Sequence, residues 1–286
     1  MTTVQPSPSN HLPTASSARR PSSTGQLARS ASVIGAATMT SRLLGLVRDQ
    51  VLAYLFGAGN AMDAFYIGFR IPNLMRDLFA EGAMSAAFVP TFTRRLTAEG
   101  RARAWQLGNQ LINALLVATG LFVLIGIIFA APLVTLFAGQ FSDIPGKLEL
   151  TTTLTRIMLP FLSLVAIAAA FMGMLNSLQQ FFTPALSPAM FNLAMIAGGF
   201  ALVPAMPSLG LPPITGMAIA ALVGGLGQVL LQWPALHRAG YRYRPMLNPR
   251  DPGLREILRL MGPGPLGLAA VQINLLVNTI LATGEG

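Results

Sequence analysis

The chain of 286 residues contains no cysteine and unusually few charged residues. Without cysteine, disulfides and thiolate metal sites are excluded. The two histidines, His11 and His237, lie in a tail and a loop, so they assemble no zinc site, and we expect no metal and no cofactor. Charged residues make up 10% of the chain, against about 25% in soluble domains. Hydrophobic residues make up 53%, and the mean hydropathy is +0.59. Such a chain cannot cover a globular surface in water, which indicates a membrane protein.

Long apolar segments recur along the sequence, and each approaches or exceeds the roughly 20 residues that cross a bilayer as a helix. Five carry little charge: residues 111–137, 151–175, 185–204, 216–236 and 266–283. Two further segments, residues 32–56 and 61–88, are apolar but interrupted by charges. Together they predict an all-α, polytopic membrane helical bundle with about seven spans.

Residues 1–30 are rich in Ser, Thr, Pro and Arg and contain no acidic residue. This composition cannot bury a core, so we predict a disordered tail. The segment lacks the apolar stretch of a secretory signal. An organelle transit peptide, which is also rich in Ser and Arg, is the alternative.

The basic residues predict the orientation of the spans. They gather in the tail, in the loop after the second span and in the segment after the sixth: Arg19, Arg20, Arg29, Arg94, Arg95, Arg101, Arg103, Arg238, Arg242, Arg244, Arg250, Arg255 and Arg259. The opposite side receives Lys147 alone. The positive-inside rule therefore predicts a multi-pass protein with a cytoplasmic N-terminus. Because the arginines lie at membrane edges, the net charge of +9 does not indicate nucleic-acid binding.

Residues 251–261 predict a short amphipathic helix in the cytoplasmic interface, within a loop at 241–265. Asp251 and Pro252 provide an N-cap and a first helical residue. Leu254, Ile257 and Met261 then recur at helical spacing.

The first two spans carry charges on one face. They contain four arginines and four acids, and Asn73 lies on the same stripe of the second span: Arg42, Arg48, Arg70, Arg76, Asp49, Asp63, Asp77, Glu81 and Asn73. A charge at the bilayer centre costs roughly 2.5 to 3.5 kcal/mol on insertion scales, so these side chains must face a cavity or one another. Pro72 predicts a kink in the second span.

Two interpretations remain open for these charges. Asp49 could neutralise Arg42, and Asp77 could neutralise Arg70, in a purely structural network; Arg42 could also reach the interface. Four arginines exceed the three mid-span acids, however, and an excess requires an anion. We therefore predict that Arg48 and Arg76 bind an anionic ligand.

Uncharged amides in the other spans either line a cavity or join helices. They are Asn176, Gln179, Gln180, Asn192, Gln228, Gln272, Asn274 and Asn278.

Several motifs resemble a known family. They are Ser41-Arg42-Leu43-Leu44-Gly45, Val47-Arg48-Asp49, Phe56-Gly57-Ala58-Gly59, Asp63-Ala64-Phe65, Pro72-Asn73-Leu74, Arg76, Phe79-Ala80-Glu81-Gly82-Ala83 and Ala87-Phe88-Val89-Pro90. This pattern is similar to the N-terminal signature of the MurJ (MviN) family, bacterial lipid II flippases of the multidrug/oligosaccharidyl-lipid/polysaccharide exporter superfamily.

The resemblance implies a transporter rather than an enzyme, with two six-helix lobes that expose a cationic cavity alternately to each side of the bacterial inner membrane. It implies Arg42, Arg48, Asp63 and Arg76 as substrate-binding residues and no catalytic residue. Asp49, Arg70, Asn73, Asp77 and Glu81 are candidates for a cavity or gating network. The implied cargo is lipid II, an undecaprenyl-diphosphate-linked muropeptide; membrane lipids and cell-wall synthesis proteins are further candidate partners in peptidoglycan biosynthesis.

The chain departs from the family pattern in two ways. The family has fourteen spans, so residues 31–240 would form the six-helix N-lobe and residues 266–286 the seventh span, at the start of a truncated C-lobe. The acid of the sodium site reported in some members is missing from residues 266–283, which puts ion coupling in doubt.

Four other functions were weighed. Another lipid-linked oligosaccharide would use the same cationic cavity, whereas a drug or cation antiporter needs an acidic one. A membrane-embedded transferase needs a carboxylate cluster, and the loops offer only Asp143, Glu149 and Asp251. A fragment that only scaffolds a cell-wall complex is not excluded.

Overall fold

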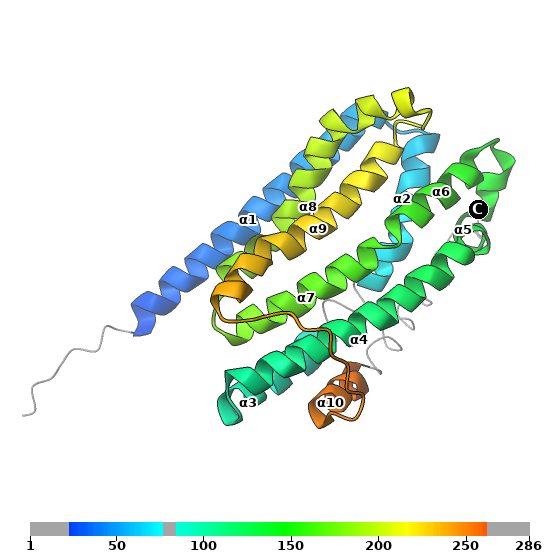
Figure 1. The fold of residues 1–286 in the computed structure, drawn as a ribbon. Helices are drawn as coiled ribbons and strands as arrows, with labels where there is room; N and C mark the ends of the chain where they lie inside the picture. The colour runs from blue at the N-terminus through cyan, green and yellow to red at the C-terminus, as the bar shows by residue number, and fades with distance from the viewer. Residues whose placement is uncertain (1–22, 77–83, 262–286) are drawn as a thin grey trace, which may run out of the picture.

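The computed structural model describes residues 23–76 and 84–261, which form a bundle of helices with no strand among them (Figure 1). The elements are α1 (Ser23–Phe56), α2 (Asn60–Arg76), the π-helical turn η2 (Met84–Phe88), α3 (Val89–Ala98), α4 (Arg101–Ile128), α5 (Ala130–Ala138), η3 (Gly139–Asp143), α6 (Lys147–Met158), α7 (Phe161–Ser177), α8 (Phe182–Ala201), η4 (Val203–Ala205), η5 (Pro207–Leu209), α9 (Thr215–Arg238) and α10 (Pro252–Met261).

The predicted all-α membrane bundle is confirmed. Four helical segments of the described residues are long and apolar enough to cross a membrane: Arg101–Ile128, Lys147–Ser177, Phe182–Ala205 and Thr215–Arg238. They correspond to the third to sixth predicted spans. The charged helices α1 and α2 are not among these four, and the seventh predicted span lies outside the described residues. The number of spans therefore stays a prediction.

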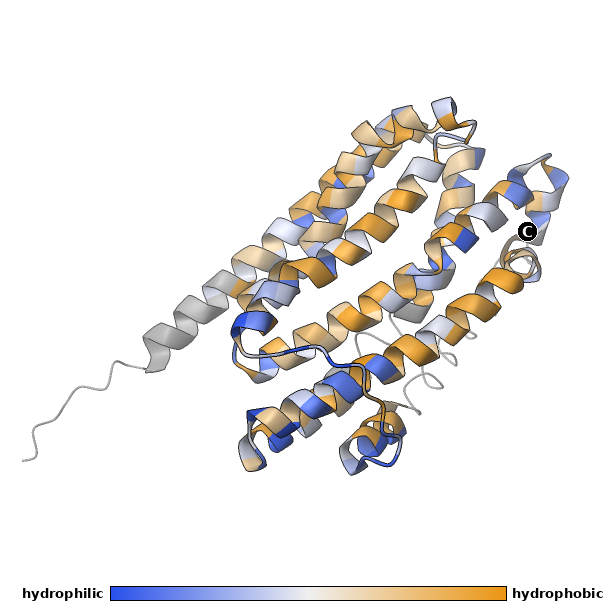
Figure 2. Cartoon of the chain, viewed as in Figure 1, coloured by the Kyte–Doolittle hydropathy of each residue, from blue (hydrophilic) through white to orange (hydrophobic). Residues whose placement is uncertain are grey.

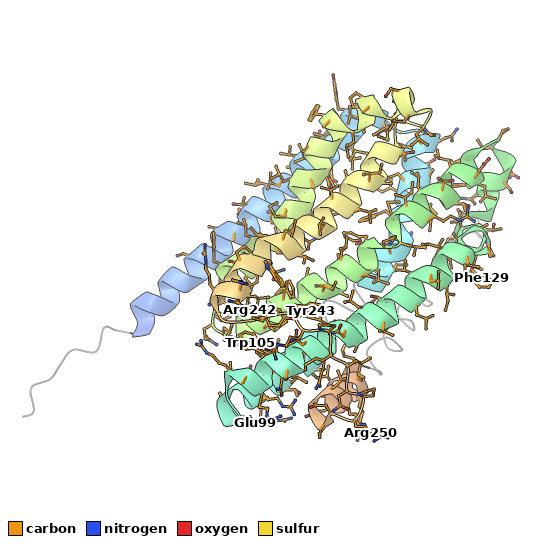
Figure 3. All side chains as sticks on the ribbon, in the orientation of Figure 1. Glu99, Trp105, Phe129, Arg242, Tyr243 and Arg250 are labelled. Atoms are coloured by element: carbon orange, nitrogen blue, oxygen red, sulfur yellow. The ribbon has the colours of Figure 1, made fainter. Side chains whose placement is uncertain are left out.

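Two predicted spans are divided by local breaks. The third is interrupted at Phe129, which has a non-helical backbone and separates α4 from α5 (Figure 3). Pro132 follows within the first turn of α5, where its missing N–H is tolerated, whereas in a continuous helix it would remove a hydrogen bond. The fourth span is interrupted at Leu159 and Pro160, between α6 and α7, for the same reason.

The first helix begins earlier than the predicted boundary of the tail. It starts at Ser23 and takes in Gln26, Leu27, Ala28 and Arg29, which are all strong helix formers. Residues 1–22 lie outside the described residues, so disorder there stays a prediction. The predicted turn after the first span is present, because Gly57 has a φ of +58° and its N–H bonds the carbonyl of Ala53.

The helix α8 packs between α1 and α9, and glycines allow the close approach. A Cβ added at Gly198 would lie 2.3 Å from the Cβ of Ala220. A Cβ added at Gly224 would lie 2.9–3.1 Å from ring and backbone atoms of Phe191. The α8–α9 contact therefore depends on the absence of side chains at these positions.

Hydrophilic residues gather at one end of the bundle, over α3, the start of α4, the segment after α9 and α10 (Figure 2). Two of the three predicted Arg-rich regions therefore lie together. The third is the N-terminal tail, whose side chains lie outside the described residues. Which membrane side this end faces stays a prediction.

The segment after α9 is fastened to α4 by two asparagines (Figure 3). Asn109 accepts hydrogen bonds from the Tyr241 hydroxyl (2.6 Å) and the Arg244 amide (3.1 Å). Asn113 accepts from the Tyr243 hydroxyl and donates to the Arg244 carbonyl. Tyr241 is fully buried, and this burial raises the pKa of its hydroxyl, so it stays a donor at neutral pH.

The helix α10 lies at the predicted place, and its apolar face packs against η2, α3 and α4. Leu254, Ile257 and Met261 are buried there, so this face meets protein rather than lipid. Asp251 accepts from the Leu254 amide as an N-cap and also pairs with Arg95 at 3.0 and 3.2 Å. Burial opposes ionisation of Asp251, but these hydrogen bonds outweigh it and lower the pKa of its carboxyl. A second pair, between Arg94 and Glu256, fastens the same contact.

Replacing Asp251 by asparagine should loosen α10, because it removes a charged cap and an ion pair together. We expect a loss of about 1–2 kcal/mol, measurable as a lower Tm and faster tryptic cleavage after Arg250. Folding lowers the pKa of the Asp251 carboxyl, so its stabilising effect is complete above the pKa of the unfolded chain. The difference in Tm between the variant and the natural protein should therefore be largest above about pH 4 and disappear as the pH falls through the lowered pKa. Asp143→Asn, at an exposed loop carboxylate, is the control. Equal Tm values for both variants at pH 7 would contradict the role of Asp251.

Candidate functional site

A cavity of about 450 Å³ lies inside the bundle, between α1, α2, α7, α8 and α9. This volume falls within the range of small-molecule sites. Its described lining combines one guanidinium, four amides, one hydroxyl and apolar groups: Arg48, Phe69, Asn73, Val165, Ala168, Ala169, Met172, Pro184, Ser187, Pro188, Phe191, Asn192, Gln228 and Gln232. Among the described residues, none of those that line it is a carboxylate.

Arg48 supplies the positive charge of this cavity. Its side chain is 26% exposed, and its Nε and Nη2 donate to Asp49 Oδ1 at 3.0 and 2.8 Å. Its Nη1 donates to Asn192 Oδ1 at 3.0 Å, and the guanidinium carbon lies 5.8 Å from the ring centre of Phe191. Of the five N–H groups of an arginine, three are used, so two remain for a ligand.

Asn192 holds this guanidinium in place. Its side chain is buried, and its Nδ2 donates to the carbonyl of Ser41 at 2.9 Å. Because that carbonyl only accepts, the amide orientation is determined, and the Oδ1 must face Arg48. Asn192 thus links α8, the α1 backbone and the guanidinium.

The structure separates the four predicted substrate-binding residues. Arg48 lines the cavity, whereas Arg42 and Asp63 do not. Arg42 is exposed on α1 and has no hydrogen bond or ion pair with another described residue. Arg76 ends α2, but its side chain lies outside the description.

Asp63 pairs with a residue that the sequence placed in a loop. Lys147 Nζ lies 2.7 Å from Asp63 Oδ2 and 4.0 Å from the ring centre of Phe141, and the lysine is buried. This ion pair joins α2 to α6, and a contact of Asp63 with substrate stays a prediction.

The predicted cavity network is only partly visible. Asp49 pairs with Arg48 instead of Arg42, because the long arginine side chain folds back onto its neighbour. Asn73 lines the cavity. Arg70 is exposed and without a hydrogen bond or ion pair among the described residues. Asp77 and Glu81 lie outside those residues.

Sequence reasoning missed Gln232, Ser187 and Phe191 as cavity residues. Gln232 lies one helical turn after Gln228 on the same helix face, and this spacing could have marked it as a candidate beside Gln228. No comparable pattern marks Ser187 or Phe191. Among the described residues, no group of three His, Asp or Glu side chains could hold a metal ion.

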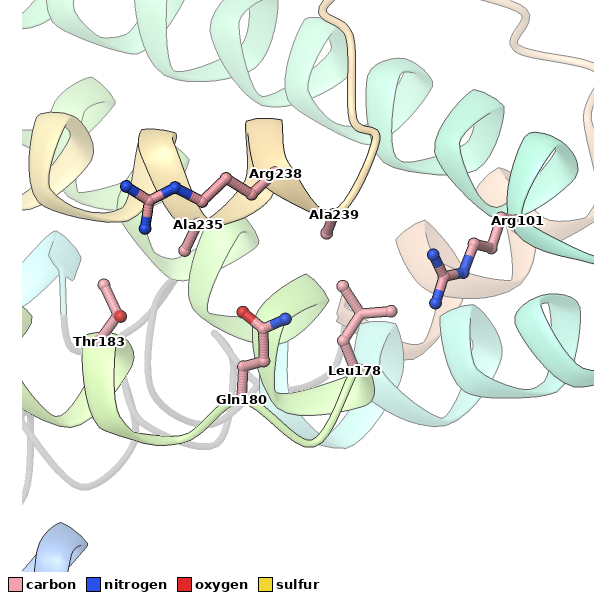
Figure 4. Close-up of a pocket in the computed structure, with 7 residues that line it drawn as sticks. All are labelled: Arg101, Leu178, Gln180, Thr183, Ala235, Arg238 and Ala239. Atoms are coloured by element: carbon pink, nitrogen blue, oxygen red, sulfur yellow. The ribbon is translucent and has the colours of Figure 1, made fainter.

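A second cavity of about 460 Å³ opens at the hydrophilic end of the bundle (Figure 4). Arg101 from the start of α4 and Arg238 from the end of α9 flank it, with Gln180 between them and Thr183 on the side of Arg238. The arginines are exposed, as expected where headgroup phosphates meet a membrane protein.

The described residues thus form a helical membrane lobe with a guanidinium on an internal cavity. Two solved structures share the fold with a TM-score of 0.66 and cover 85% of this chain. One is a MATE transporter in complex with MaD3S. Its sequence is 16% identical to this chain, and the match covers 53% of its length. The other is lipid II flippase MurJ in an inward closed conformation. Its sequence is 26% identical to this chain, and the match covers 49% of its length.

Sequence comparisons give the family. The family model for lipid II flippase MurJ matches residues 52–284. A probable lipid II flippase MurJ of Vibrio cholerae is 37% identical over 265 residues, which is 90% of this chain and 50% of the relative. The lipid II flippase MurJ of Burkholderia cenocepacia is 34% identical, over 87% of this chain and 48% of the relative. The chain belongs to the MurJ family, and it spans about half the length of these curated relatives.

Proposed function

We propose that this chain forms the first lobe of a transporter that moves lipid II from the cytoplasmic to the outer leaflet of the bacterial inner membrane. The relatives are named for this activity, and the fold is shared with alternating-access transporters. The diphosphate of the substrate binds at Arg48, and the Arg-rich end of the lobe, with the N-terminus, faces the cytoplasm.

The observation that carries this proposal is the position of Arg48. Its guanidinium lies on the cavity wall, is fixed by Asn192 and Asp49, and retains two N–H groups. A planar fork of N–H groups matches two phosphate oxygens, which makes arginine suited to a diphosphate. The described lining residues include an arginine and no carboxylate, which favours an anionic cargo over a cationic one.

The other charged residues complete the proposal. Arg42 and Arg76 add positive charge along the path of the diphosphate, and Asp63 contacts substrate once its bond to Lys147 opens. Asp49, Arg70, Asn73, Asp77 and Glu81 form the network that changes partners between the two states. Because Asn192 joins α8 to the α1 backbone, these two helices move as one unit during the transition.

Binding of a polyprenyl diphosphate to the purified chain in detergent tests this function. The natural chain should bind the diphosphate more tightly than the corresponding uncharged polyprenol. Arg48→Ala should weaken diphosphate binding about 30- to 150-fold, the equivalent of about 2–3 kcal/mol for a charged hydrogen bond. Arg48→Lys should retain part of the affinity.

Arg103→Ala is the matched control, since Arg103 is exposed and contacts only Gln106 among the described residues. It should bind like the natural chain. Equal affinity for the diphosphate and the polyprenol, or equal losses in Arg48→Ala and Arg103→Ala, would overturn the proposed role of Arg48.

A further inference from the structure

The second cavity, of about 460 Å³, lies where the four apolar helical segments begin or end. Its polar lining residues come from these ends: Arg101 from the start of α4, Gln180 and Thr183 from the turn between α7 and α8 and the first turn of α8, and Arg238 from the end of α9. Because these segments cross the membrane, their ends lie at the level of the phospholipid headgroups.

Two guanidiniums on this cavity have no partner among the described residues. Arg101 and Arg238 form no hydrogen bond or ion pair with them, and they lie on either side of Gln180 (Figure 4). Other arginines at the same end of the bundle bond a carboxylate, an amide or a backbone carbonyl, namely Arg94, Arg95, Arg103, Arg242 and Arg255. Like charges on one cavity repel each other, and an anion between them removes that repulsion.

The turn between α7 and α8 positions the polar groups between the two arginines. Gln179 has a left-handed φ of +61°, and the N–H groups of Gln179 and Gln180 bond the carbonyls of Asn176 (3.0 Å) and Leu175 (2.9 Å). This is the hydrogen-bond pattern of a Schellman motif, which fixes the path of the chain after α7. The side chains of Gln180 and Thr183 form no hydrogen bond with a described residue, so an amide and a hydroxyl are available as donors.

These donors fit a phosphate that carries an apolar attachment. Guanidinium groups bind phosphate oxygens, and the described lining residues contain no carboxylate that would repel them. Leu178 and Ala235 add apolar surface beside the arginines. Along α9, exposed apolar side chains at Val223, Leu226 and Leu230 lead from the interior of the bilayer toward this end. A soluble phosphate would leave that surface uncovered, whereas the glycerol and acyl chains of a phospholipid cover it.

We propose that Arg101 and Arg238 bind the phosphate of an anionic phospholipid from the leaflet that borders this end of the lobe, and that the bound lipid joins α4 to α9. A zwitterionic phospholipid has the same phosphate but also a cation, which the two arginines repel, so the site selects lipids of net negative charge. The inference goes beyond the function proposed above and does not depend on it, because this site shares no described lining residue with the cavity at Arg48.

The chain carries its own probes for this test. It has two tryptophans, of which Trp105 lies four residues after Arg101 and Trp233 lies five residues before Arg238. Brominated acyl chains quench a tryptophan that they contact, so quenching measures which lipid lies beside α4 and α9. The purified chain is reconstituted in phosphatidylcholine vesicles that contain rising fractions of brominated phosphatidylglycerol or of brominated phosphatidylcholine.

The natural chain should bind phosphatidylglycerol about tenfold more tightly than phosphatidylcholine. The double variant Arg101→Gln with Arg238→Gln should lose this preference. An excess of inorganic phosphate should leave the preference of the natural chain unchanged, because a soluble anion gains nothing from the apolar surface. Arg48→Ala should also keep it, since the central cavity is a separate site.

Arg103→Gln with Arg259→Gln is the matched control. It removes the same two charges from the same end of the bundle, but both residues are exposed and neither lines this cavity. It should keep the preference for phosphatidylglycerol. Both double variants should have the Tm of the natural chain in neutral detergent, which separates loss of lipid binding from loss of folding.

Four outcomes would overturn the inference: equal binding of the two lipids by the natural chain; an equal loss of preference in both double variants, as expected from surface charge alone; removal of the preference by inorganic phosphate, as expected of a site for a soluble anion; or loss of the preference in Arg48→Ala. The lipid site can fail in any of these ways while Arg48 still binds a polyprenyl diphosphate, so its failure is distinguishable from failure of the proposed function.

Discussion

Arg48→Ala should abolish transport of the lipid-linked precursor while the helices still insert into the membrane. The variant loses the donor of the diphosphate contact, and it also leaves the Asp49 carboxylate without its cation partner. The cavity wall then loses its positive charge, and the unpaired Asp49 carboxylate beside it repels the phosphate groups. We expect loss of growth in a strain that is depleted of its own flippase and whose only source of flippase is the variant gene that carries this chain.

The double variant Arg48→Ala with Asp49→Ala separates the two causes. If repulsion by Asp49 contributes, the double variant should bind the diphosphate better than Arg48→Ala but worse than the natural protein. Arg103→Ala should grow normally. Normal growth of Arg48→Ala at equal membrane abundance would contradict a role for this residue in substrate binding.

Gly224→Val should destabilise the lobe more than any other single substitution considered above. The first carbon of the new side chain would lie 2.9–3.1 Å from the ring, Cα and carbonyl oxygen of Phe191. Backbone atoms cannot rotate away as a flexible side chain would, so α8 and α9 must separate. Overpacking of this kind costs about 1–3 kcal/mol or more. Phe191 also stacks on Phe69, at 5.8 Å between ring centres, so the cavity wall should be displaced with it.

The measurement is the Tm of the purified variant, followed by size-exclusion chromatography during heating. Gly120→Val is the control, because nothing lies within 4 Å of a Cβ at that position. A Tm for Gly224→Val equal to that of Gly120→Val would show that α8 and α9 tolerate separation and that the close contact is not required.

The helical bundle was predictable because a span of about 20 apolar residues has few other stable outcomes. Hydropathy averaged over such a length cannot resolve a single break, so Phe129 passed unnoticed. Pro160 was visible in the sequence, yet its effect depends on whether neighbouring groups satisfy the freed carbonyl, which only the packed structure shows.

The site was predictable only in part. The motif around Arg48 led to the cavity, but its partners Asp49 and Asn192 were not predicted. Residues one apart on a helix point in different directions, which disfavours a pairing of Arg48 with Asp49 by spacing alone. The pair Asp63–Lys147 spans 84 positions of sequence, and the contact of Gln232 with Ala168 joins two helices. Neither has a local pattern, so both require the tertiary arrangement.

The central claim, a water-accessible cavity with positive charge inside the lobe, is tested most directly by thiol labelling. Because the chain has no cysteine, Met172→Cys introduces a single reactive group on the cavity wall, and Leu121→Cys places one on the exposed apolar face of α4 as a control. In membranes, an anionic thiosulfonate should modify residue 172 faster than a cationic one of the same size. Residue 121 should react with neither reagent. A polyprenyl diphosphate should protect residue 172 from modification. Faster modification of residue 172 by the cationic reagent, or no modification at all, would contradict the account.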